Sequence, residues 1–211
     1  MLRSIMLAVF YLLGYSLQGQ HPGYGPLMDT AVFDRQFSAA SEKIHSIRCD
    51  FVQEKNLAML SEKIVSKGKF WFKKDKQVRM EYEQPYPYLV IINNNKMFIK
   101  DGQKETKVSL GSNKLIKQIN GLIIDCIQGT SLHNPDFRVK VFENKQDYLV
   151  ELMPAGTQLK DFLKHIDITI DKKDYTATAI EMFELSGDNT LIYFNNREIN
   201  ISIPDALFSL K

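Results

Sequence analysis

Short stretches in which apolar and polar residues alternate are the feature that most constrains the fold of this chain. The clearest case is residues 68–85, with the sequence GKFWFKKDKQVRMEYEQP. Its apolar residues fall on one face of two successive runs, Phe70 and Phe72 in the first and Val78, Met80 and Tyr82 in the second. A period of two is typical of strands that bury one face, and the charged residues 73–77 between the runs indicate a turn. The stretch therefore predicts a hairpin with a large apolar inner wall, which we expect to bind an apolar ligand.

The same alternation recurs along most of the chain. Strands are expected at residues 47–54, 61–74, 76–83, 88–92, 96–100, 104–110, 137–144, 148–154, 165–171, 176–184 and 191–197. Short turns separate most of them, which favours antiparallel pairing. Apolar residues recur at helical spacing at 28–46, where Asp29 or Thr30 can cap a helix, and again at 112–129. We expect a mainly β (α+β) fold, an open antiparallel β-barrel or half barrel of about ten or eleven strands with helices covering its hydrophobic mouth.

The first residues are typical of a secretory signal peptide. Arg3 gives a short positive start, an apolar run follows at 5–17, and Gly19 and Gln20 come next. The run is short for a membrane span, so we expect cleavage near Gly19 or Gln20, the alternative being an uncleaved anchor helix. The predicted organisation is a signal peptide at 1–19, a flexible lead-in at 20–27 and a single domain at 28–211.

Charge and cysteine content narrow the classes of function. The 211 residues carry a net charge of +2, which falls to +1 without residues 1–19, and this balance gives no reason to expect a nucleic-acid partner. The two cysteines, Cys49 and Cys126, are too few for a structural zinc site. Both lie among apolar residues, so we expect two separate buried thiols, with a disulfide between them as the alternative.

The sequence contains no motif of a known catalytic or cofactor-binding site. The four histidines are His21, His45, His133 and His165, and none has an acidic or cysteine neighbour at the spacing of metal ligands. Asp161, His165 and Asp167 lie close together, but a solvated strand end explains them better than a catalytic site. We therefore expect a binding protein with no enzymatic activity, cofactor or metal.

Several short segments, in order along the chain, carry a resemblance to one family. They are residues 50–53 (DFVQ), 68–73 (GKFWFK), 78–82 (VRMEY), 84–85 (QP), 89–91 (LVI) and 203–208 (IPDALF). Together they resemble the pattern of the LolA-like proteins, the periplasmic carriers of outer-membrane lipoproteins. The resemblance covers residues 30–210, and it is the ordered set rather than any single segment that makes it specific.

The resemblance implies a fold, a role and partners. It implies an unclosed barrel with a helical lid that carries the acyl chains of lipoproteins through the periplasm of a Gram-negative bacterium, from the inner to the outer membrane. It also implies exchange of cargo with an inner-membrane lipoprotein-releasing ABC transporter and an outer-membrane acceptor, the carrier being a monomer. Two other roles stay open: a non-enzymatic module of the same fold that senses lipoproteins, and a periplasmic hydrolase, which the missing catalytic motif disfavours.

The resemblance also assigns residues to an acyl cavity. The expected wall residues are Phe51, Phe70, Phe72, Val78, Met80, Tyr82 and Val90. The expected lid residues are Leu115, Ile119, Leu122 and Ile123. For each wall residue, packing in an ordinary core is the alternative to contact with an acyl chain.

The chain departs from the family pattern at two functional positions. In related carriers an Arg-Pro pair supplies an arginine that holds the lid shut, whereas this chain has Lys74-Asp75, and lysine lacks the planar fork of arginine. The family's tryptophan is Met80 here, a softer wall. We expect Lys74 and Arg79 at the lid latch or the rim, where Arg79 would contact a partner or a lipid head group, the alternative being a solvent-side salt bridge.

Overall fold

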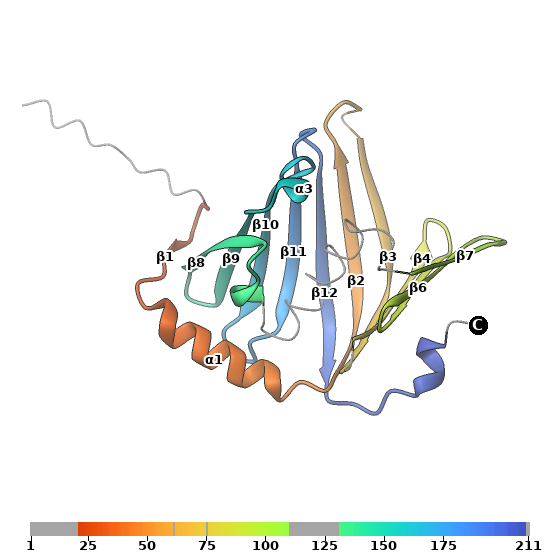
Figure 1. The fold of residues 1–211 in the computed structure, drawn as a ribbon, viewed down its shortest axis with the longest axis horizontal. Coiled ribbons are helices and arrows are strands. Elements are labelled where there is room, and N and C mark those ends of the chain that lie inside the picture. The colour runs from red at the N-terminus through yellow and green to blue at the C-terminus, as the bar shows by residue number, and fades with distance from the viewer. Residues whose placement is uncertain (1–20, 61, 75, 110–130, 210–211) are drawn as a thin grey trace, which may run out of the picture.

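The computed structural model describes residues 21–60, 62–74, 76–109 and 131–209, which form one twelve-stranded antiparallel sheet (Figure 1). The strands are β1 (Gly25–Pro26), β2 (Ser46–Leu57), β3 (Glu62–Lys73), β4 (Gln77–Gln84), β5 (Tyr88–Asn93), β6 (Lys96–Asp101), β7 (Lys104–Ser109), β8 (Phe137–Glu143), β9 (Asp147–Pro154), β10 (Leu163–Asp171), β11 (Ala177–Glu184) and β12 (Asn189–Ile199). The helices are α1 (Thr30–Glu42), α3 (Thr157–Lys160), η2 (Ser131–His133) and η3 (Asp205–Phe208).

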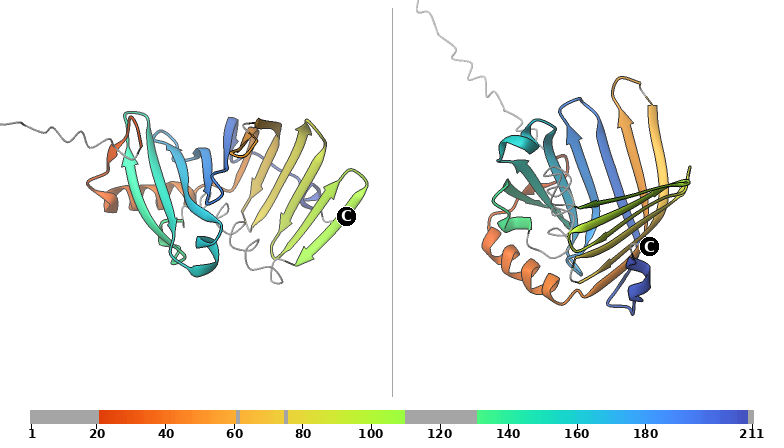
Figure 2. Two further views of the ribbon diagram at one scale, coloured as in Figure 1. Left: turned by 90° about the horizontal axis from the view of Figure 1, so that it is seen from above. Right: turned by 45° about the vertical axis from the view of Figure 1, so that its right-hand side comes forward.

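The sheet is strongly curved and open (Figure 2). Its strand order is β1-β8-β9-β10-β11-β12-β2-β3-β4-β5-β6-β7, so that within the described residues β1 and β7 are two edges that do not pair with each other. All eleven predicted strands are present, and the open antiparallel half barrel is confirmed. The additional strand, β1, has only two residues, too few for a periodic pattern to be read from the sequence.

Helix α1 lies against the ends of the strands at one side of the sheet (Figure 1). Asp29 caps it, because its Oδ1 accepts a hydrogen bond of 3.0 Å from the Val32 amide, and Phe33 and Phe37 are its buried apolar residues. The helix ends at Glu42, earlier than the pattern predicted, because the Asn200 side chain bonds the backbone of Lys43 and so fixes the turn into β2. The second predicted helix, at 112–129, lies outside the described residues.

The two faces of the sheet carry different clusters of apolar side chains. Residues that lie opposite each other in neighbouring antiparallel strands share a face. One such row runs Cys49, Phe70, Met80, Val90 and Ile99 across β2 to β6, and the Phe33 and Phe37 side chains of α1 belong to the same cluster. We call this side the concave apolar face, because the strands curve around it (Figure 2). Among the described helices, none is both long enough and apolar enough to span a bilayer.

The opposite, convex face carries the C-terminal segment. Trp71, Ile91 and Phe98 form a row on this face of β3, β5 and β6, and Ile203 and Phe208 pack onto it. Phe208 is fully buried against the convex face. Because both faces of β5 are covered, its residues 89–92 form a continuous apolar run.

Residues 21–27 are packed against the sheet, which differs from the flexible lead-in suggested by their composition. Gly25 and Pro26 pair with β8, and the Leu27 amide donates a 3.0 Å hydrogen bond to the Val141 carbonyl. His21 reaches the Glu151 carboxylate on β9. These contacts connect segments more than a hundred residues apart, so no local pattern reveals them. Residues 1–20 lie outside the described part of the chain, and the signal peptide stays a prediction.

Candidate functional site

The structure brings all seven predicted wall residues together on the concave apolar face. Phe51, Phe70, Phe72 and Val78 belong to its buried cluster, and Met80, Tyr82 and Val90 pack against that cluster as half-buried residues. They come from four neighbouring strands, β2 to β5, whose registers place their alternate residues in line. The face therefore has a closed apolar floor and a more exposed region along β4 and β5.

Aromatic contacts give this face its shape. The Phe51 and Tyr82 rings meet edge to face with their centroids 4.9 Å apart, and Tyr82 meets Tyr88 in the same way at 5.5 Å. The Tyr82 hydroxyl donates a 3.0 Å hydrogen bond to the Gln53 side chain. Burial raises the pKa of Tyr82 to about 12, with a smaller contribution from Tyr88, so this wall residue stays neutral at ordinary pH.

Gly68 makes room for the aromatic rings of this face. It lies between Phe51 and Tyr82 in the register, at a point where the pairing of β3 with β4 shifts by one residue. A Cβ at this position would overlap the Glu81 carbonyl oxygen and lie 2.9 Å from Phe51 Cε1. Only glycine permits this approach of backbone and ring, which explains its presence inside a strand.

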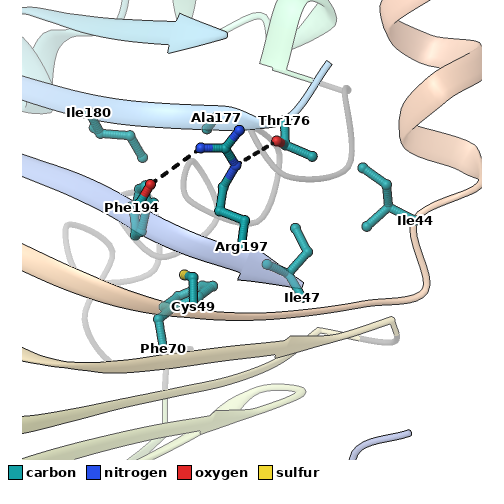
Figure 3. Close-up of a pocket in the computed structure, with 9 residues that line it drawn as sticks. All are labelled: Ile44, Ile47, Cys49, Phe70, Thr176, Ala177, Ile180, Phe194 and Arg197. Carbon is teal, nitrogen blue, oxygen red and sulfur yellow. Dashed lines mark hydrogen bonds between the residues drawn. The ribbon is translucent and has the colours of Figure 1, made fainter. Parts of the chain in front are cut away.

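A small cavity lies among side chains of the concave apolar face (Figure 3). It encloses about 20 Å³, room for little more than one water molecule. Its lining residues are Ile44, Ile47, Cys49, Phe70, Thr176, Ala177, Ile180, Phe194 and Arg197. An acyl chain needs far more space, so this cavity can take one only if its lining side chains move apart.

Arg197 supplies the polar end of this cavity, and the sequence did not single it out. Its Nε donates a 2.9 Å hydrogen bond to Thr176 Oγ1, and its NH1 donates one of 3.3 Å to the Phe194 carbonyl (Figure 3). Its NH2 lies 3.3 Å from Asp171 and 3.6 Å from Asp174, whose carboxylates balance its charge. The guanidinium is thus held at the cavity wall, and the rest of the lining is almost wholly apolar.

Cys49 is a buried free thiol in the same cavity wall. Burial raises the pKa of its thiol to about 12. The nearby Arg197 lowers this pKa by less than burial raises it, and Asp50 raises it further. The expectation of a buried thiol holds for Cys49. Cys126 lies outside the described residues.

We expect Cys49 to resist alkylation in the folded protein. A pKa of about 12 leaves roughly one molecule in 10,000 as the reactive thiolate at pH 8, and the thiol is also shielded from solvent. Iodoacetamide at pH 8 should leave Cys49 unmodified in native protein and modify it fully in 6 M guanidinium, with peptide mapping by mass spectrometry separating it from Cys126. Rapid alkylation of Cys49 in native protein would contradict its placement in the wall.

The two predicted latch or rim residues lie at the end of α1 and on the convex face, and Arg79 forms the salt bridge that was the alternative for it. Lys74 Nζ donates a 3.3 Å hydrogen bond to the Glu42 carbonyl, and so bonds the last residue of α1. Arg79 lies on the convex face, where its guanidinium bonds the Glu81 carboxylate and donates a 3.1 Å hydrogen bond to the Leu207 carbonyl. It therefore fixes the C-terminal segment to the sheet. The expected lid residues, Leu115, Ile119, Leu122 and Ile123, lie outside the described residues.

The solvated strand end expected around His165 and Asp167 is wrong in one respect. The two residues lie two positions apart on β10, but Asp167 is only 8 % exposed. His21 and Glu151 lie next to it, at 3.4 Å for His21 Nδ1 to Asp167 Oδ2 and 3.0 Å for His21 Nε2 to Glu151 Oε2. Sequence spacing could not reveal this cluster, because its members come from the N-terminal segment, β9 and β10.

The sequence of this chain matches a known protein family and a named relative. Residues 42–211 match the family described as outer membrane lipoprotein carrier protein LolA. A protein of Francisella philomiragia, named outer-membrane lipoprotein carrier protein, is 29% identical over 194 residues, which cover 85% of this chain and 93% of that protein.

Two solved structures resemble the fold at low sequence identity. The crystal structure of MucB has a TM-score of 0.52 and 12% identity, covering 88% of this chain and 64% of MucB. An uncharacterized conserved protein of Thermus thermophilus has a TM-score of 0.50 and 7% identity, covering 85% of this chain and 93% of that protein. These two structures show similarity of fold alone.

Proposed function

Because the chain belongs to the LolA family of outer membrane lipoprotein carrier proteins, we propose that it is a periplasmic carrier of lipoproteins. It binds the acyl chains of its cargo on the concave apolar face and transports the lipoprotein from the inner to the outer membrane. The observation that carries the proposal is the gathering of all seven predicted wall residues into one apolar surface on an open sheet.

The physical need for such a carrier follows from the cost of exposing acyl chains to water. Each buried CH₂ contributes about 0.8 kcal/mol, so a protein anchored by two or more chains does not leave a bilayer unaided. A carrier must offer an apolar surface of comparable quality and still release its cargo. The concave apolar face provides such a surface. Its side chains pack against one another and leave a cavity of only about 20 Å³, so their own packing competes with the acyl chain.

Met80, Tyr82 and Val90 are the proposed entry side of this surface. They are half-buried, whereas Phe51, Phe70 and Phe72 behind them are almost fully buried. Methionine changes shape at low cost, which suits a wall that has to repack around chains of different length. An acyl chain would first cover the exposed parts of these three side chains and then displace the rings behind them.

The proposal includes the partners and the location expected of such a carrier. Cargo would come from an inner-membrane lipoprotein-releasing ABC transporter and pass to an outer-membrane acceptor, with the protein acting as a monomer and without a cofactor. A signal peptide at 1–19 would direct the domain at 28–211, with its preceding residues, to the periplasm. No step of this cycle calls for enzymatic activity.

Release of lipoproteins from spheroplasts tests the proposal directly. Spheroplasts that synthesise a radiolabelled triacylated lipoprotein are incubated with the purified protein, and the supernatant is assayed for a soluble complex of the two. We expect the lipoprotein to appear there only when native protein is added, and not with heat-denatured protein. Cargo that stays membrane-bound, although a synthetic triacylated peptide binds the protein, would favour the sensing role over transport.

A further inference from the structure

The N-terminal segment closes over a polar cluster on the convex side of β8 to β10. His21 is the centre of this cluster, and its two ring nitrogens face different carboxylates, Glu151 at 3.0 Å and Asp167 at 3.4 Å. Both carboxylates are buried, with Glu151 fully inaccessible to solvent. His165 approaches from the same strand as Asp167, its Nε2 lying 3.8 Å from Asp167 Oδ2.

The register of the sheet places like charges directly opposite each other here. Lys140, Glu151, Asp167 and Glu181 form one row across β8, β9, β10 and β11. Their formal charges sum to −2, and like charges in directly opposed positions destabilise a sheet. The two outer carboxylates are compensated by contacts within the sheet: Lys140 Nζ lies 3.5 Å from Glu151, and Asn189 donates a 2.6 Å hydrogen bond to Glu181. Asp167, between them, has the weakest such contact from a neighbouring strand.

Asp167 shows the consequence of this arrangement. Among the described residues its Oδ1 is buried without a hydrogen-bond partner. A carboxylate in such a place gains from any cation that can reach it.

We propose that His21, Glu151 and Asp167 bind a divalent transition-metal ion, with Zn²⁺ as the best match. One donor atom from each of the three residues lies within 4.8 Å of the other two. A nitrogen donor combined with carboxylates suits Zn²⁺ and its neighbours, while Mg²⁺ and Ca²⁺ prefer oxygen alone. His165, beside Asp167, and water can complete the coordination.

The separation of His21 and Asp167 fits this assignment. Two ligands bound tetrahedrally at about 2.0–2.1 Å from a zinc ion lie about 3.3 Å apart. His21 Nδ1 and Asp167 Oδ2 are separated by 3.4 Å. The ion would join the N-terminal segment to β9 and β10.

Calorimetric titration of Zn²⁺ tests the site. The protein is expressed from its full-length sequence, purified without a polyhistidine tag and treated with EDTA before titration. We expect one Zn²⁺ per molecule, a melting temperature that rises with Zn²⁺ and not with Mg²⁺, and affinity at least tenfold lower in His21→Ala and in Asp167→Asn. His21→Ala alters only the edge of the fold, so its loss of binding would not reflect unfolding.

A second histidine substitution provides the matched control. His133 is an exposed histidine that contacts Asp34 at 3.1 Å, away from the cluster, so His133→Ala should bind Zn²⁺ as the unmodified protein does. The proposal is overturned if the protein binds no Zn²⁺ at 1 mM, or if His21→Ala and Asp167→Asn retain full affinity.

Discussion

Replacing Met80 by glutamate should weaken binding of a triacylated peptide by at least 100-fold while the protein still folds. Met80 is half-buried on the concave apolar face, between Phe70 and Val90 in the register. A carboxylate there can reach solvent in the free protein, so folding tolerates it. Once an acyl chain covers the site, the charge loses its water, and a 100-fold loss of affinity corresponds to about 3 kcal/mol.

The measurement is a fluorescence titration with a labelled triacylated peptide, accompanied by circular dichroism to verify folding. Met59→Glu is the matched control, because it introduces the same side chain at a residue that is 94% exposed beyond the end of β2. We expect its affinity to be unchanged. If Met80→Glu bound the peptide as tightly as the control, the concave apolar face would not be the acyl site.

Gly68→Ala should destabilise the protein by about 2–4 kcal/mol, measured as the free energy of unfolding in urea. The added Cβ would overlap the Glu81 carbonyl oxygen on the neighbouring strand, where backbone has to move, and would also press on the Phe51 ring. The displaced backbone lies where β3 pairs with β4, in the middle of the proposed acyl wall. We therefore expect weaker peptide binding as well.

Gly25→Ala is the corresponding control at the edge of the sheet. Nothing lies within 4 Å of a Cβ built on Gly25, so the same chemical change should alter the free energy of unfolding by less than about 0.5 kcal/mol. Equal stabilities of the two variants would show that β3 and β4 adjust freely at Gly68, against the close approach described above.

Much of the proposed acyl surface could be predicted because it is built from residues that lie close together in the sequence. Alternation in residues 68–85 places Phe70, Phe72, Val78 and Met80 on one side of a hairpin, and the structure keeps them there. The short turns likewise require neighbouring strands to pair in order. The cavity could not be foreseen, since Arg197 and Thr176 reach it from β12 and the β10–β11 turn, far along the chain from Cys49.

The sequence alone determined the strands, the antiparallel pairing of strands joined by short turns, and which of their residues share a face, because a period of two is a property of neighbouring residues. The pairing of β12 with β2 and of β1 with β8 is set by the tertiary structure. Tertiary structure alone decided what covers each face. It placed the C-terminal segment and Arg79 on the convex side, and it brought His21 to Glu151 and Asp167. These contacts depend on sheet curvature and on registers between distant strands, and a local pattern contains neither.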